Sequence, residues 1–281
     1  MAVPFPPSET HHSPNVALAG HSTNLVGIPT ELLASPDFNQ HPLPLRIHGT
    51  REAHSGLFAR LGRCENLREA GGVFQDYMSV VFGFEEEQRL GEDRQGRRRF
   101  RGSYLRLLQD WGFDSNNPQG AVLKGWVESR FGLFPTFHKQ PLTGFATPAW
   151  MDYVEEKMAS RFHNNCIYLQ LDLLFEFCQW AIARFETPAR RHVRLYRGVD
   201  SLGEFCPLGA GNGREILVRL NNIVSFSADR TQAGQFGAYI LETEVPVVKL
   251  LFFNDLLPSH PLRGEAEYLV IGGGYRVKIV V

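Results

Sequence analysis

The sequence lacks the features that would favour a nucleic-acid or membrane protein. Its net charge is −1, from 29 Lys and Arg against 30 Asp and Glu, so no bulk charge attracts DNA, RNA or an anionic lipid surface. No apolar run approaches about 18 residues, so we expect no membrane span. The segment from Met1 to Thr10 has neither a basic start nor an apolar core, and we therefore expect no signal peptide.

Cysteine is also scarce. The four cysteines are Cys64, Cys166, Cys178 and Cys206. No two of them have Cys-x-x-Cys spacing, so we expect reduced, mostly buried thiols in a cytoplasmic protein. No histidine pair has metal-ligand spacing with a matching carboxylate, and no bound metal is expected.

Several nucleotide-site motifs are missing or incomplete. There is no Walker loop and no Gly-x-Ser-x-Gly elbow. The glycine-rich stretch Gly209–Gly213 lacks the third glycine of a dinucleotide fingerprint and is followed by a β-type run, so it predicts a loop. The basic run Arg97–Arg101 follows the acidic Glu85–Glu87. These charges fit solvated helix ends or a docking patch for an acidic protein.

What the sequence does contain divides it into a helical part and a β-rich part. Residues 1–20 are rich in Pro, Ser and His and predict a disordered tail. Residues 21–186 read as an arm lying on the surface, followed by helices. Residues 187–281 alternate in the manner of strands. Helices first and strands second predict an α+β fold, which we treat as one integrated domain.

The expected elements are specific enough to be checked. We expect helices over 51–69, from Thr147-Pro148 with Met151, Val154 and Met158 on one stripe, and a central buried helix from Cys166 to Phe185. We expect strands over 192–199 and 216–226, a helical turn over 229–236, and two strands over 238–253 broken at Pro246. The last stretch, 267–281, predicts a hairpin turned at Gly272-Gly273-Gly274.

Two carboxylates, Glu265 and Glu267, lie two residues apart at the head of an apolar run. In a strand such residues point to the same side, about 7 Å apart. Like charges repel there, and desolvation raises their pKa, so the arrangement is costly. A solvated hairpin corner would also explain the pair.

Two upstream strands carry further polar residues. Arg197 interrupts an apolar strand. It could be a surface ion-pair partner, or its planar guanidinium could bind a phosphate. In the second case, Gly198 would let the ligand approach the backbone closely. Ser225 and Ser227 end the next strand. One explanation is that a serine caps the following helical turn. The other is that Ser225 holds a catalytic carboxylate in place while Ser227 caps the turn or bonds the ligand.

In this order, the arginine, the Ser-x-Ser pair and the Glu-x-Glu pair resemble the Arg-Ser-Glu class of mono-ADP-ribosyltransferases over residues 192–281. The stretches Asn24–Asn39, Leu195–Val199 and Glu265–Glu267 resemble the dinitrogenase reductase ADP-ribosyltransferase family, and this likeness runs over nearly the whole chain. Members of that family switch nitrogenase off in nitrogen-fixing bacteria.

The resemblance implies a helical region followed by two packed, mostly antiparallel sheets with an NAD cleft between them, so that 187–281 is the NAD-binding catalytic core. It implies transfer of ADP-ribose from NAD to one arginine of the nitrogenase iron protein, with release of nicotinamide. It also suggests recognition of the ADP-bound iron protein and control by P-II signalling proteins.

The resemblance further implies roles for individual residues. Glu267 matches the glutamate that bonds the nicotinamide ribose and stabilises an oxocarbenium-like centre. Ser225 matches the serine that orients this glutamate. Glu265 matches the second acid, which marks arginine as the acceptor. The NAD-binding set is Arg197 for a phosphate, Gly198 for the nicotinamide amide, Ser227, and Phe236 as the ring stacked on nicotinamide.

Two other classes of function remain open from the residues alone. The same acids could act on water in an NAD glycohydrolase or a glycoside hydrolase. The cleft could also belong to a catalytically idle NAD-binding module. Labelled NAD, followed with and without iron protein, separates these alternatives.

Overall fold

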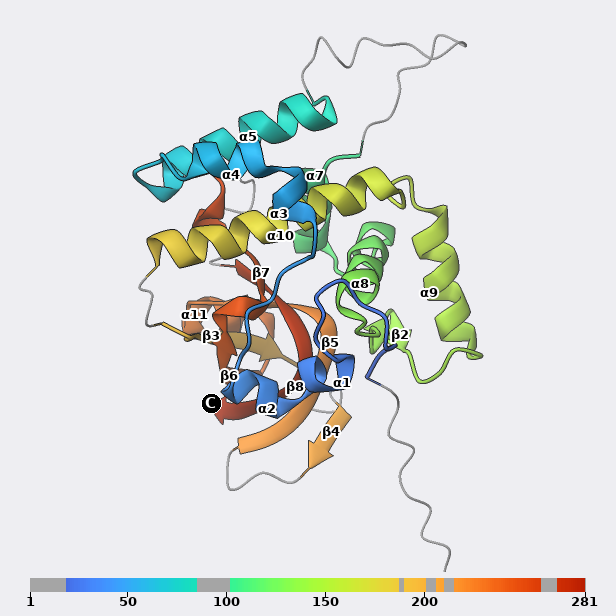
Figure 1. The fold of residues 1–281 in the computed structure, drawn as a ribbon. Coiled ribbons are helices and arrows are strands. Elements are labelled where there is room, and N and C mark those ends of the chain that lie inside the picture. The colour runs from blue at the N-terminus through green and yellow to red at the C-terminus, as the bar shows by residue number, and fades with distance from the viewer. Residues whose placement is uncertain are drawn as a thin grey trace, which may run out of the picture.

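The computed structural model describes residues 19–84, 102–186, 190–200, 206–209, 215–258 and 267–280. Most of the helices gather at one end and along one side of the molecule, and the strands form a compact body below them (Figure 1). Within these residues the buried apolar side chains form one hydrophobic cluster that includes helices and strands alike. We therefore treat the helical region and the sheet as one unit.

Helices come first along the described chain. They are α1 Thr30–Ala34, α2 Pro36–Gln40, α3 Thr50–Ala53, α4 Ser55–Leu61, α5 Leu67–Phe82, α7 Tyr104–Phe113, α8 Pro118–Phe131, α9 Pro148–Ala159 and α10 Asn165–Phe185. The single helix expected over 51–69 is wrong, because the chain leaves the helical path after Leu61 and Asn66 caps a new helix through the main-chain N–H of Glu69.

The predicted start of α9 is confirmed, and its predicted apolar stripe is wrong. Thr147 caps the helix by accepting from Trp150 N at 3.3 Å, and Pro148 is its first residue. Met151 and Met158 are exposed, whereas Tyr153 is the buried residue of this helix. The helix therefore packs through an aromatic face.

The helix α10 is the central buried helix that the sequence predicts. It has the length and mean hydropathy, 1.2, of a membrane span, but most of it is buried in the protein core. It lies between α5 on one side and a strand on the other (Figure 1). Its buried carboxylate Glu176 accepts a hydrogen bond from Ile47 N at 2.6 Å and also forms an ion pair with Arg51.

The strands form one antiparallel sheet. They are β3 His192–Val199, β4 Cys206–Gly209, β5 Glu215–Ser227, β6 Tyr239–Pro246, β7 Leu250–Phe253 and β8 Glu267–Val280, in the order β4-β5-β3-β6-β8-β7. Because β5 also pairs with β8, the sheet closes on itself and the two expected layers are joined. The α+β class is confirmed. A separate hairpin, β1 Phe137–His138 with β2 Gln140–Pro141, lies beside α9 (Figure 1).

The hairpin expected over 267–281 is wrong, because β8 is one continuous strand of 14 residues. Its glycines bend the strand rather than reverse it. At Gly272 a Cβ atom would lie 1.6 Å from Asn221 O, where the register between β5 and β8 shifts. Gly273 has φ +114 and packs against Ala34. The glycines therefore let β5 and the arm approach the strand closely.

The arm is built into the core rather than lying on the surface as expected. Its buried apolar side chains are Val26, Ile28, Leu33, Ala34, Phe38, Leu45 and Ile47. Asn39 Nδ2 donates to Gly274 O on β8 at 2.8 Å. The expected burial of the thiols holds for Cys64 and Cys178, whereas Cys166 is exposed.

A buried lysine beneath the arm gives a test of this packing. Lys249 is 0% exposed, and its Nζ lies over the rings of Phe38 and Tyr275. Burial lowers its pKa from 10.5 to about 7. Between these values the unfolded chain holds a proton that the folded chain lacks, so Lys249 makes stability rise with pH in this window.

We expect Lys249→Met to remove this dependence. The free energy of unfolding of the parent protein, minus that of the variant, should rise by about 1.4 kcal/mol for each pH unit between about pH 7 and 10. Urea unfolding at several pH values measures it. Lys278→Met, an exposed control on β8, should retain the parent's pH trend. Parallel pH profiles of the parent and Lys249→Met would contradict the prediction.

Candidate functional site

The structure brings together the arginine, serine and glutamate that the sequence predicts to share a site. Ser225 Oγ donates to Glu267 Oε1 at 2.6 Å. Arg197 Nη1 donates to the main-chain oxygen of Ser225 at 2.8 Å. Arg197 lies on β3, Ser225 on β5 and Glu267 on β8, so three strands converge at the end of β5.

Strand register explains this convergence. Ser227 lies opposite Glu267, and Ser225 opposite Leu269, in the antiparallel pairing of β5 with β8. Opposite residues point to the same side of a sheet, and diagonal neighbours are within reach of polar side chains. The two serines and the glutamate therefore share one face. The pairing of Tyr196 with Ser227 brings β3 to the same point.

The cluster is largely withdrawn from water. Glu267 and Ser227 are each 7% exposed, and Ser225 is half-buried. A carboxylate in such surroundings interacts more strongly with a nearby positive charge than one in bulk water does. The hydrogen bond from Ser225 offsets part of the desolvation cost of the Glu267 carboxylate.

The segment after β5 packs tightly on β3. It comprises α11 Arg230–Ala233 and η2 Gly234–Phe236. A Cβ atom at Gly198 would lie 2.0 Å from Ala233 O, so only glycine allows this approach. Phe236 ends this segment with its side chain 62% exposed. The predicted ring is therefore accessible on a segment anchored beside Gly198.

The serine cap predicted for the turn after β5 is wrong, because the capping residue is Asp229. Ser227 Oγ accepts from Asp229 N at 3.0 Å and so holds the capping residue in place. Asp229 in turn caps α11 by accepting from Thr231 N at 2.7 Å. Ser227 thus shapes the turn between β5 and α11, while Ser225 donates to the carboxylate of Glu267.

Other predicted features lie outside the described residues. These are Glu265, Arg97–Arg101 and the loop residues 210–213. Among the described residues, no group of three or more His, Cys, Asp or Glu side chains could hold a metal ion.

The residue that sequence reasoning missed is Trp111 on α7. Its Nε1–H donates to Ser225 Oγ at 2.8 Å. The sequence places Trp111 on an apolar helical stripe, and it is indeed buried, with 4% exposure. A buried indole N–H needs a hydrogen-bond acceptor, and this need is the signal that the sequence offers. The sequence pattern does not say which residue provides the acceptor.

Comparison with known proteins bears on the family of the chain. The chain matches the family model described as dinitrogenase reductase ADP-ribosyltransferase over residues 23–279. It is 58% identical over 261 residues to a Rhodospirillum rubrum protein named NAD(+)--dinitrogen-reductase ADP-D-ribosyltransferase, covering 92% of this chain and 95% of the relative. No solved structure matches significantly. Since both matches span nearly the whole chain, the protein belongs to the dinitrogenase reductase ADP-ribosyltransferase family.

Proposed function

We propose that this protein is a mono-ADP-ribosyltransferase that moves ADP-ribose from NAD to a specific arginine of the nitrogenase iron protein, dinitrogenase reductase, and thereby inactivates it. Family membership and the name of the R. rubrum relative support this reaction. The observation that carries the proposal is the 2.6 Å bond from Ser225 to Glu267, with Arg197 bonded to the same serine's main chain.

Glu267 is the group we assign to bond cleavage. When the C–N bond between the anomeric carbon and nicotinamide breaks, both electrons go to the pyridinium nitrogen. Nicotinamide then leaves as a neutral molecule, and positive charge develops on the ribose. A fixed carboxylate stabilises charge that appears only in the transition state. Ser225 holds this carboxylate in one orientation.

Glu265 is the acid we assign to the acceptor. The arginine guanidinium is protonated in water and is a poor nucleophile. A carboxylate two residues before Glu267 can hold its N–H fork and aim one nitrogen at the anomeric carbon. As the new C–N bond forms, the guanidinium loses one proton to the Glu265 carboxylate, which passes it to water. The two carboxylates thus have separate tasks.

The remaining predicted residues are assigned to NAD. Arg197 binds a phosphate, and its bond to Ser225 O holds the guanidinium in place. Gly198 offers its main chain to the nicotinamide amide. Phe236 stacks on the nicotinamide ring, which is consistent with its exposure. Ser227 contacts the ligand from the turn that it shapes.

The family likeness also supports finer assignments. We propose that the substrate is the ADP-bound form of the iron protein, that a P-II signalling protein regulates the transferase, and that the reaction takes place in the cytoplasm. The scarcity of cysteine and the absence of Cys-x-x-Cys spacing are consistent with a reducing compartment.

Mass spectrometry of iron protein after incubation with this protein and NAD tests the function. We expect one added ADP-ribose on one arginine, with nicotinamide released in equal amount. Nicotinamide release that is independent of iron protein, without any modified arginine, would identify a glycohydrolase. Absence of both products with every acceptor would identify an idle binding module.

A further inference from the structure

Trp111 extends the site into the helical region. Its indole Nε1–H donates to Ser225 Oγ at 2.8 Å, and the same hydroxyl donates to Glu267 Oε1 at 2.6 Å. A continuous line of hydrogen bonds therefore runs from α7 through β5 to the carboxylate on β8.

The number of hydrogens available gives this line a direction. A serine hydroxyl has one hydrogen to donate and lone pairs that accept, whereas an indole N–H only donates. Trp111 therefore occupies a lone pair of Ser225, and the single hydroxyl hydrogen goes to Glu267. Without the indole, the hydroxyl is freer to rotate to other acceptors, and Glu267 loses a fixed donor.

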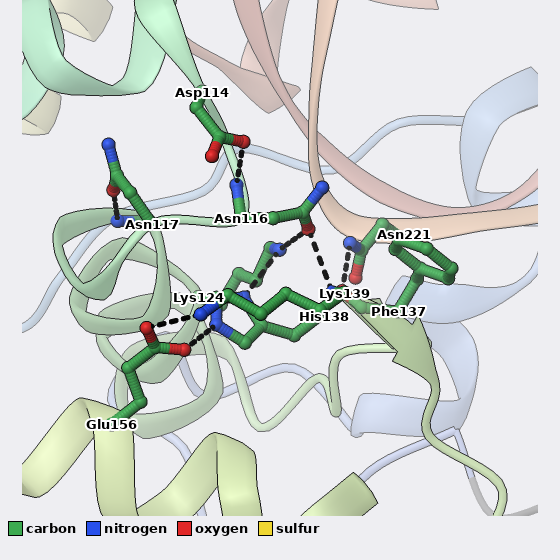
Figure 2. Close-up of polar contacts among 10 residues, drawn as sticks. Asp114, Asn116, Asn117, Lys124, Phe137, His138, Lys139, Glu156 and Asn221 are labelled. Atoms are coloured by element: carbon green, nitrogen blue, oxygen red, sulfur yellow. Dashed lines mark hydrogen bonds and ion pairs between the residues drawn. The ribbon is translucent and has the colours of Figure 1, made fainter.

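A buried polar network fixes the turn that follows α7. Asn116 Oδ1 accepts from Lys124 Nζ at 3.1 Å and from Lys139 N at 3.2 Å (Figure 2). Lys124 Nζ also lies 3.0 Å from His138 Nδ1, and His138 Nε2 lies 2.7 Å from Glu156 Oε2. Lys124 is only 1% exposed and its contact with His138 is buried, whereas the bond from Lys139 N lies at the surface. The network ties the end of α7 to α8, α9 and the β1–β2 hairpin.

The strand that carries Ser225 is fixed to the same frame. Asn221 Nδ2 donates to Phe137 O at 2.8 Å (Figure 2). Asn222 Nδ2 donates to Lys124 O at 2.8 Å. Both asparagines lie at the register shift of β5. Helix α7 and strand β5 are thus held to one set of buried groups, which sets the distance from Trp111 to Ser225.

We propose that Trp111 is a positioning residue for ADP-ribose transfer, acting through Ser225 to fix the carboxylate of Glu267. The inference rests on the proposed function, since it takes Glu267 as the group that stabilises the ribose cation. It gives the helical region a part in positioning the carboxylate, beyond its part in the core.

The test compares Trp111→Phe, Ser225→Ala and the double variant in the full-length protein, with nicotinamide release and labelling of iron protein as readouts. We expect Trp111→Phe to lower kcat about five- to tenfold, the size of one neutral hydrogen bond, with KM for NAD within about twofold. Added to Ser225→Ala, it should change kcat by less than about twofold, because the indole then has no hydroxyl to orient.

Trp126→Phe is the matched control. This tryptophan is also buried and donates its indole N–H, to Asp172 Oδ1 at 2.8 Å. Its loss removes an indole bond to a carboxylate, which is at least as strong as a bond to a hydroxyl, at a place away from the serine. We therefore expect kcat of the folded variant to stay within about twofold of the parent. A comparable loss of kcat in this control would show that any missing indole bond has the same effect.

Two results would overturn the inference. One is full activity of folded Trp111→Phe. The other is a multiplicative loss in the double variant, which would mean that the two residues act independently. Should Trp111→Phe fail to fold, benzothienylalanine at position 111 keeps the ring shape without the N–H. A parent protein that releases no nicotinamide would instead refute the proposed function.

Discussion

Replacing Glu267 with glutamine is expected to lower ADP-ribose transfer at least ~10²-fold, the scale of losing one group that stabilises the transition state. Glutamine keeps the size of the side chain and can still accept from Ser225. It removes the negative charge that the developing ribose cation needs. Nicotinamide release and labelling of iron protein should fall together, because bond cleavage comes before transfer.

A surface glutamate provides the control for this variant. Glu244 on β6 is exposed and pairs with Arg194 at 2.8 Å. Such exposed ion pairs contribute little to stability. We expect Glu244→Gln to retain full activity and Glu267→Gln to unfold with similar cooperativity to the parent. Undiminished transfer by folded Glu267→Gln would end the assignment of this carboxylate.

Replacing Glu265 with glutamine is expected to separate the two reactions. Transfer to arginine should fall about 10²-fold, because the guanidinium is no longer held and aimed. Slow hydrolysis of NAD should fall by less than about threefold, because water needs no such grip and Glu267 is intact. The two rates are read in one experiment with labelled NAD, with and without iron protein. Equal losses in both would contradict the division of tasks.

Local patterns predict much of this fold. Alternation of apolar and polar residues over 192–195, with Val199 at the far end, predicts β3 with its observed bounds, His192–Val199, and an all-round apolar composition identifies α10. In both elements, the apolar side chains of the pattern are the ones that the core covers, such as Val193 and Leu195 on β3.

The failures occur where packing overrides a local signal. Three successive glycines ordinarily predict a turn, but in β8 they let β5 and the arm pack closely against a strand that continues to Val280. Met151 and Met158 fit a helical stripe, yet α9 buries Tyr153 instead. Which face of a short amphipathic helix is covered depends on its neighbours, which the helix's own sequence does not contain.

For the site, the ordered resemblance to the Arg-Ser-Glu class of ADP-ribosyltransferases grouped Arg197, Ser225 and Glu267. Alternation places each residue on a face of its strand, but it does not say which strands pair. The contact of Trp111 with Ser225 could not be predicted, because it spans 114 positions of sequence and joins a helix to a strand. Long-range contacts of this sort depend on how helices dock, which local periodicity does not encode.

The arm that inserts into the core also makes the sheet dependent on the N-terminal part of the described chain. Asn39 holds β8 through Gly274, and its main-chain oxygen lies 2.6 Å from His192 Nε2 on β3. Losing the arm would expose the apolar interior of the sheet to water. A proteolytic cut that released residues 24–47 would therefore lower the stability of the protein rather than mature it.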